Sequence, residues 1–148
     1  MKLDIDDTDV NVIKKGRDDY FSLTDMVKAK LRDASVANWL RSKKTLEMLG
    51  MWEYKNNPKF NCAEFGMFMD MAGTGNFRIS VKEWIERTDA IGLVAKPGKS
   101  GGTYAHKDIA FEFGGWVDPL FKLLLVGEYE RLKEKEQKST NFVTSNYK

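Results

Sequence analysis

The sequence predicts an α+β fold: a small, mostly helical domain with a β-hairpin and short strands, ending in a long helix. The hairpin is indicated by two short apolar runs, 91–94 and 103–105, separated by the Gly- and Pro-rich stretch 96–102. The long helix is indicated by apolar residues at helical spacing from Phe121 to Leu132. A length of 148 residues suits a single domain.

The N-terminal part predicts short strands. Residues 3–15 alternate weakly between apolar and polar side chains, and either Asp6-Asp7 or Thr8-Asp9 is suited to turn a small hairpin. Gly16 then breaks the pattern, and residues 20–21 form a short strand candidate.

Five helices are expected between this strand and the hairpin. Each is opened by short polar residues whose oxygens can accept from the free amides of a first turn. They begin near Ser22 or Thr24, residues 33–35, Thr45, Asn61 and Ser80. The fifth start is the clearest, because Glu83 three residues after Ser80 completes a capping-box pattern.

After the hairpin we expect a short helix over about 106–115 and a long helix from Asp118, with Pro119 at its first position. The apolar stripe of the long helix should pack beneath the hairpin and the 106–115 helix. That stripe consists of Phe121, Leu125, Tyr129 and Leu132. Residues 139–148 have the composition of a loose tail, so the domain is expected to span residues 1–138.

Composition favours a cytoplasmic protein. No apolar stretch is long enough to cross a bilayer, and Met1 is followed by Lys2 and acidic residues instead of an apolar leader. The single cysteine, Cys62, has no internal disulfide partner, and it lies on an apolar helix where we expect it to be buried.

Several aromatic side chains occupy core-like positions in these patterns. We expect them to pack inside the domain instead of stacking on bases, and they are Tyr20, Trp39, Trp84, Trp116 and Phe121.

The charge distribution is more informative than the net charge of +2. Residues 11–44 carry nine cations and four anions, a net charge of +5, whereas residues 1–10 carry a net charge of −3. Between Asp89 and Asp108 there is no carboxylate. The hairpin tip is therefore a cationic projection beside helices, which is the arrangement of a wing that reaches a nucleic-acid groove.

Basic and small residues in three places are candidate DNA contacts. In the tip they are Lys96, Lys99, Ser100 and Gly101; after the second helix they are Arg41, Ser42, Lys43 and Lys44; near the N-terminus they are Lys14, Lys15 and Arg17. The alternatives are an ordinary surface loop for the tip, and for the second group a solvated helix C-terminus, where cations are favoured.

Patterns of catalytic chemistry are weak. Gly98-Lys99-Ser100 departs from a phosphate-binding loop, because Leu93 stands where the first glycine is required. His106 is the only histidine, and it is expected to order the junction between hairpin and helix or to contact a phosphate. With neither a metal-ligand cluster nor a triad in view, we expect no cofactor and no enzyme activity.

Two segments carry a family resemblance. Residues 101–110, GGTYAHKDIA, followed by 116–121, WVDPLF, resemble the KilA-N signature, and residues 20–26 with 39–41 are similar to the family's opening strand and first two helices. KilA-N domains occur in phages, bacteria and large DNA viruses and are similar to the APSES domain of fungal transcription factors. The resemblance covers roughly 10–132, and the helical material of 46–90 departs from a minimal KilA-N pattern.

The resemblance implies a DNA-binding module with an exposed hairpin, of phage or mobile-element origin, with a regulatory role. Double-stranded DNA is the expected partner. The alternative is a protein-interaction module that keeps the fold with weak or no DNA binding, and an enzyme is a third possibility. The long helix offers a surface for another protein, and we expect a monomer or a weak dimer with no membrane partner.

Overall fold

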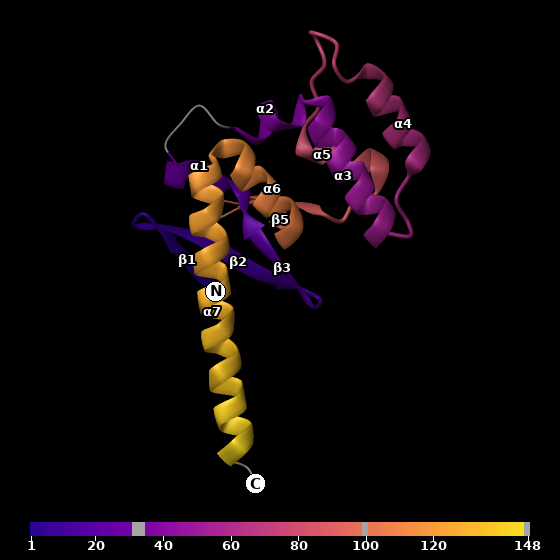
Figure 1. The fold of residues 1–148 in the computed structure, drawn as a ribbon. Coiled ribbons are helices and arrows are strands. Elements are labelled where there is room, and N and C mark those ends of the chain that lie inside the picture. Colours follow the sequence, from indigo (N-terminus) through magenta and orange to yellow (C-terminus); the bar gives the residue numbers. More distant parts are fainter. Residues whose placement is uncertain (31–34, 99–100, 147–148) are drawn as a thin grey trace.

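The computed structural model describes residues 1–30, 35–98 and 101–146, and within them it shows the expected α+β fold (Figure 1). The strands are β1 Lys2–Ile5, β2 Thr8–Lys15, β3 Asp18–Ser22, β4 Leu93–Lys96 and β5 Gly102–His106. The helices are α1 Leu23–Lys30, α2 Val36–Leu40, α3 Lys43–Asn56, α4 Cys62–Met71, α5 Val81–Thr88, α6 Lys107–Val117 and α7 Pro119–Asn146. The five strands form one antiparallel sheet in the order β1-β2-β3-β5-β4.

The first hairpin turns at Asp6-Asp7, one of the two positions that the sequence predicted. Both aspartates have positive φ, 50° and 64°, and Ile5 pairs with Thr8 across the turn. A two-residue turn with positive φ at both positions matches the right-handed twist of the strands that it joins, and aspartate is among the few residues that tolerate it. Local turn chemistry therefore sets the register of β1 against β2.

Strand β3 joins the N-terminal strands to the distant hairpin. Phe21 pairs with Val12 of β2 and with Ala105 of β5, and Ala105 pairs in turn with Leu93 of β4. These four residues occupy one row, and so their side chains lie on one face of the sheet. We call this the core face.

Helices α1, α6 and the first half of α7 pack on the core face (Figure 1). Phe21 meets Phe111 of α6 edge to face at 5.4 Å and Tyr129 of α7 at 5.1 Å between ring centroids. Phe121, Leu125 and Tyr129 are buried, as predicted. Helix α7, however, packs against α6 and β1 instead of beneath the β4–β5 hairpin, because β1 and β2 form the half of the sheet that α6 leaves uncovered.

Helices α2 to α5 form a second group beside the sheet (Figure 1). Trp84 of α5 is fully buried and is surrounded by three rings, those of Phe60, Phe65 and Phe68. Ser80 and Glu83 form the predicted capping box at the start of α5. The 46–90 stretch is thus a packed helical unit, and its α5 contacts β4.

Two predicted core residues are exposed. Trp116 is 44% exposed, because it lies on the outer face of α6 with its ring stacked on Phe113. Cys62 is also exposed; it is the first residue of α4, in which Phe68 is the buried residue. Tyr20, Trp39, Trp84 and Phe121 are buried, as expected.

The helical backbone of α7 continues to Asn146 and so includes most of the stretch predicted as a loose tail. Among the described residues, no helix combines the length and apolar character needed to cross a membrane.

Candidate nucleic-acid interface

The β4–β5 hairpin forms the wing that the sequence predicted. Lys96 pairs with Gly102 at its outer end, and the amide of Gly101 donates to the carbonyl of Gly98 at 3.0 Å. Gly98 has a φ of 103°, and a side chain on Gly101 would overlap the backbone of Lys96 and Pro97. The glycines are therefore required by the turn itself. Lys99 and Ser100, two predicted contacts, lie outside the described residues.

A buried carboxylate anchors the base of the wing. Glu53 of α3 is 1% exposed and accepts from the amides of Ile91 at 2.9 Å and Gly92 at 2.7 Å. Asn57, one helical turn further along α3, donates its side-chain amide to the same carboxylate at 2.9 Å. The hydroxyl of Tyr20 donates to the carbonyl of Ile91 at 2.9 Å. These bonds fix where the wing leaves the domain.

Sequence reasoning missed Glu53, although a signal was present. The residue follows Leu46 and Leu49 at i+7 and i+4, so it occupies the apolar stripe of its helix. A carboxylate on a buried stripe needs compensating hydrogen bonds, and these come from an element almost forty residues away.

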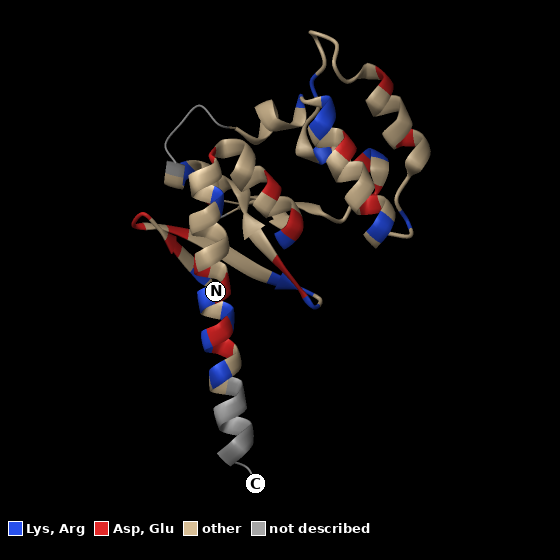
Figure 2. Cartoon of the chain, in the orientation of Figure 1, with Lys and Arg blue, Asp and Glu red and all other residues tan. Residues whose placement is uncertain are grey.

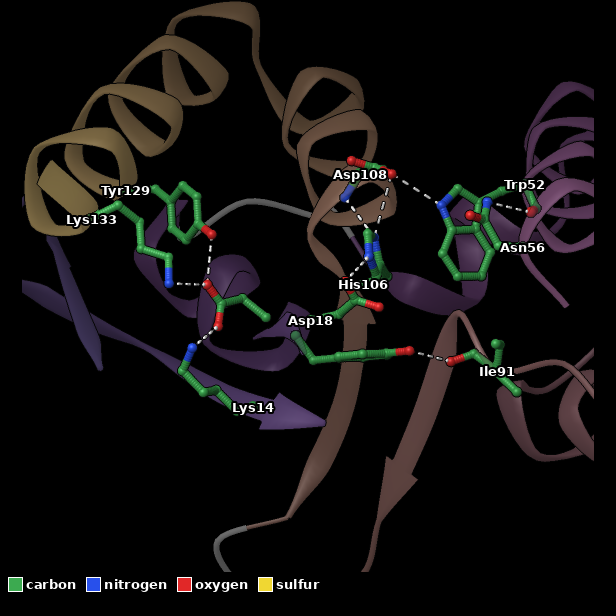
Figure 3. Close-up of polar contacts among 11 residues, drawn as sticks. Lys14, Asp18, Trp52, Asn56, Ile91, His106, Asp108, Tyr129 and Lys133 are labelled. Carbon is green, nitrogen blue, oxygen red and sulfur yellow. Dashed lines mark hydrogen bonds and ion pairs between the residues drawn. The ribbon is translucent and has the colours of Figure 1, made fainter. Parts of the chain in front are cut away.

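His106 orders the junction between the wing and α6, one of its two predicted roles (Figure 3). Its Nδ1 accepts a hydrogen bond from the amide of Asp108 at 3.1 Å, so the His106 side chain caps the N-terminus of α6. Its Nε2 faces a carboxylate oxygen of Asp18 at 3.5 Å, and its Nδ1 also lies 3.6 Å from the Asp108 carboxylate. The ring is also packed against Trp52 and Tyr20, with centroids 4.8 and 5.6 Å away.

A basic groove lies beside the wing. It has a volume of about 520 Å³ and is lined by Lys15, Lys82, Ile85, Glu86, Ala90, Leu93, Val94, Ala95, Lys96 and Pro97. Its three lysines come from β2, α5 and β4, and the acid among these lining residues, Glu86, lies 3.9 Å from the ammonium of Lys82. We call this the wing groove.

The sheet register explains why two distant lysines meet at the wing groove. Lys15 and Lys96 both point to the face opposite the core face, which also carries Tyr20 and Tyr104. Their ammonium groups lie 5.8 Å from the ring of Tyr20 and 6.0 Å from that of Tyr104. Nothing in the sequence indicated Lys82, because only the packing of α5 against β4 brings it here.

Lys14 has a different surrounding from its neighbour Lys15. It points to the core face, where its ammonium lies 3.7 Å from Asp19 (Figure 3). The same carboxylate accepts from the hydroxyl of Tyr129 at 2.6 Å and lies 3.1 Å from Lys133. Arg17 is exposed in the β2–β3 turn, at the end of the sheet opposite the wing tip. The structure therefore does not bring these two residues into the wing groove.

The Arg41 to Lys44 segment forms a separate basic group. Lys43 and Lys44 are the first two residues of α3, so the interpretation of them as a helix C-terminus is wrong. Ser42 is the N-cap without a side-chain cap bond, and the first turn has no acidic residue. Arg41, Lys43 and Lys44 are exposed. In Figure 2 the blue start of α3 lies in the upper half of the view, well separated from the β2–β3 turn below it.

The lysines of this turn are unfavourably placed for folding. A helix N-terminus carries partial positive charge, so cations there are repelled and an anion is attracted. Amides at such a position are also well placed to bind phosphate. The wing groove and the α3 N-terminus are thus two places where basic residues among those described border free surface.

The Asp19 cluster, which ties α7 to the sheet, makes stability depend on pH. Burial alone would raise the pKa of Asp19, but the Tyr129 hydroxyl and the Lys133 ammonium outweigh it and hold the pKa below its ordinary value. A carboxylate with a lowered pKa in the folded state contributes stability above its unfolded pKa, and this contribution is lost as the pH falls through the folded pKa. Burial, followed by the bond to Asp19, raises the pKa of Tyr129.

We therefore expect Asp19→Asn to lower the free energy of unfolding at neutral pH by about 1–3 kcal/mol, as for a buried charged hydrogen-bonding group. The difference from wild type should shrink steadily below about pH 5. Urea titrations at a series of pH values measure both quantities. Asp70→Asn, on the exposed side of α4, is the matched control and should change neither. A difference that stayed constant down to low pH would contradict this account.

Within the described residues there is no group of three or more His, Cys, Asp or Glu side chains that could hold a metal ion.

Comparison with protein families identifies one match: the model described as the KilA-N domain covers residues 4–135. The matched region includes the end of β1, all of β2 to β5, α1 to α6 and the first half of α7. Comparisons with curated proteins and with solved structures gave no match.

Proposed function

The chain belongs to the KilA-N family, whose domains are generally DNA-binding modules, and on this premise we propose that it binds double-stranded DNA through the wing groove and the N-terminus of α3. It does so as a non-enzymatic, cytoplasmic module of phage or mobile-element origin with a regulatory role. Residues 1–138 form the DNA-binding domain.

The observation that carries the proposal is the convergence of three lysines on a groove beside the wing. Lys15, Lys82 and Lys96 line it from three elements, and all four residues of β4 are among its lining residues. A major groove is wide enough to admit a two-stranded ribbon such as the β4–β5 hairpin. With the hairpin in the DNA groove, lysines at its side are placed to reach the flanking phosphates.

The N-terminus of α3 supplies phosphate contacts that are independent of the wing. Lys43 and Lys44 offer charge, and the uncapped first turn offers backbone amides. Contacts of this kind set affinity and orientation without reading sequence. The wing, by contrast, reaches base edges. The N-terminus of α3 therefore contributes mainly to affinity, and the wing contributes to sequence preference.

Fluorescence anisotropy with a labelled duplex at several salt concentrations tests the proposal. About five phosphate contacts predict a slope near −4 to −5 in the plot of log binding constant against log salt. The pair Lys43→Ala and Lys44→Ala should make the slope less steep by about 1 for each lysine–phosphate interaction removed, equally for all sequences. Lys82→Ala should do the same, whereas Lys96→Ala should also relax sequence preference.

The control for these variants is Lys59→Ala, an exposed lysine in the loop between α3 and α4. It removes the same charge and should leave the slope unchanged. Absence of binding to any duplex at low salt would remove the proposal. Equal and sequence-independent losses from the wing and α3 variants would show that the wing only contacts the DNA backbone.

A second candidate function is protein interaction, which one surface observation favours. Helices α3 and α4 expose Met51, Tyr54, Met67 and Met71. Methionine side chains adapt their shape and are common on binding surfaces. Pull-down with and without nuclease separates the candidates: partners that survive nuclease support protein interaction, and partners that vanish support DNA binding.

A further inference from the structure

The first half of α7 has an exposed apolar face. Leu120, Leu123 and Leu124 are 61%, 70% and 43% exposed, and Trp116, four residues before Leu120 near the end of α6, is a fourth exposed large apolar side chain at 44%. The leucines and Gly127 follow the spacing i, i+3, i+4 and i+7, so they form one stripe along the helix. This stripe lies opposite the buried side that holds Phe121, Leu125 and Tyr129.

The stripe borders an open groove. The groove has a volume of about 410 Å³ and is lined by Asp4, Ile5, Asp6, Leu123, Leu124, Gly127, Glu128 and Arg131. Apart from Gly127, its two chain neighbours and the backbone of its own helix, no atom of the described residues lies within 4 Å of the place where a Cβ on Gly127 would stand. Gly127 therefore leaves a notch in the stripe, next to the groove, that this part of the chain does not fill.

We propose that this face is the interface of a weak, symmetric dimer of the chain, in which the two α7 helices cross antiparallel near Leu123 and Leu124. In that arrangement Leu120 of each copy enters the notch at Gly127 of the other copy. A single two-fold rotation then forms this contact twice, once at each end of the stripe, as a closed symmetric interface requires. Arg131 of each copy comes near the exposed Trp116 ring of the second copy, which attracts a cation.

A second copy fits this face better than an unrelated partner because the stripe is complementary to itself. A large side chain at one end matches a glycine seven residues away at the other end. The exposed fractions of the four large side chains amount to roughly 400 Å² per copy, about half of the 800 Å² per partner in a stable complex. The dimer is therefore weak and forms in a concentration-dependent manner.

The inference goes beyond DNA binding and does not depend on it, because the association is measured without DNA. Two copies would present two wings, and paired wings suit paired half-sites.

Sedimentation velocity of the wild-type chain, from low to high micromolar concentration, tests the proposal. We expect the mean mass to rise with concentration. Gly127→Gln fills the notch with a side chain that the monomer accommodates, since the site is open. This variant should remain monomeric over the whole range, with a melting temperature no lower than that of wild type.

The matched control is Gly66→Gln in α4, another helical glycine with open space around it. It makes the same change at a distance from the interface and should associate as wild type does. Leu123→Asn is a second interface variant and should also be monomeric. The proposal fails if wild type is monomeric throughout, if Gly127→Gln associates like wild type, or if Gly66→Gln weakens association equally.

Discussion

Glu53→Ala is expected to lower the free energy of unfolding by about 3–5 kcal/mol, because each buried donor left without its acceptor costs about 1–3 kcal/mol. Three donors lose their acceptor in this variant: the amides of Ile91 and Gly92 and the side chain of Asn57. Gly92 and Asn57 are buried, whereas Ile91 is 37% exposed. The cavity left by the truncation adds to the cost. Urea unfolding followed by circular dichroism measures the change.

Two variants sharpen this test. Glu47→Ala removes a carboxylate from an exposed position of the same helix and should change stability by less than about 0.5 kcal/mol. Glu53→Gln keeps one acceptor oxygen but turns an amide group toward a backbone donor, so its loss should be intermediate. If Glu53→Gln matched wild type, one oxygen would suffice, and either the bond to Gly92 or the bond to Asn57 would be dispensable.

The same change has a consequence for the wing. Ile91 and Gly92 are the residues from which β4 departs, and the amide of His106 donates to the carbonyl of Gly92 at 2.8 Å. Loss of Glu53 should therefore disturb the wing before it disturbs the distant β1–β2 hairpin. Hydrogen exchange of the two hairpins, compared in a variant that remains folded, shows whether the effect has this order.

The second large effect is expected for Trp84→Ala, with a loss of about 3–5 kcal/mol for a fully buried tryptophan. Its ring fills the space between Phe60, Phe65 and Phe68, with centroid distances of 5.9 to 6.0 Å. The indole Nε1 has no hydrogen-bond partner among the described residues, so the loss arises from packing alone. The midpoint of chemical unfolding measures it.

Trp116→Ala is the matched control, since it removes the same side chain from a site that is 44% exposed. At a concentration too low for dimer formation its cost should be about 1–2 kcal/mol, clearly less than for Trp84→Ala, because the solvent already reaches much of the ring. Equal losses from the two substitutions would contradict the assignment of one tryptophan to the core and the other to the surface.

Local features of the structure were predictable because they depend on residues close together in the chain. The Asp6-Asp7 turn needs only two residues that tolerate positive φ, and the Ser80–Glu83 capping box needs one helical turn. The wing is indicated in the same way, by two apolar runs and a glycine-rich tip. The stripe of α7 repeats with the helical period, which predicts both the helix and its buried side.

The predictions were wrong where the same sequence pattern is compatible with two different structural environments. Trp84 and Trp116 both lie among apolar neighbours in helices. Trp84 is covered by α4 and by Phe60 of the loop before it, whereas Trp116 stays 44% exposed beside Phe113. Lys43 and Lys44 were interpreted as the end of one helix. In the structure α2 ends at Leu40, Ser42 is the N-cap of α3, and the two lysines are the first residues of α3. Periodicity shows that a face is apolar and does not show what packs on it.

What the sequence determined by itself is therefore the α+β fold, its wing and its membership of the KilA-N family, because each follows from backbone preferences and motifs within short segments. What only the tertiary structure decided is which charges meet: Lys15, Lys82 and Lys96 around the wing groove, and Glu53 beneath the base of the wing. These residues are separated by tens of positions. Their proximity depends on how the helices and the sheet pack. That packing is stabilised by the burial of apolar side chains from the whole domain, and no short segment of the sequence specifies it.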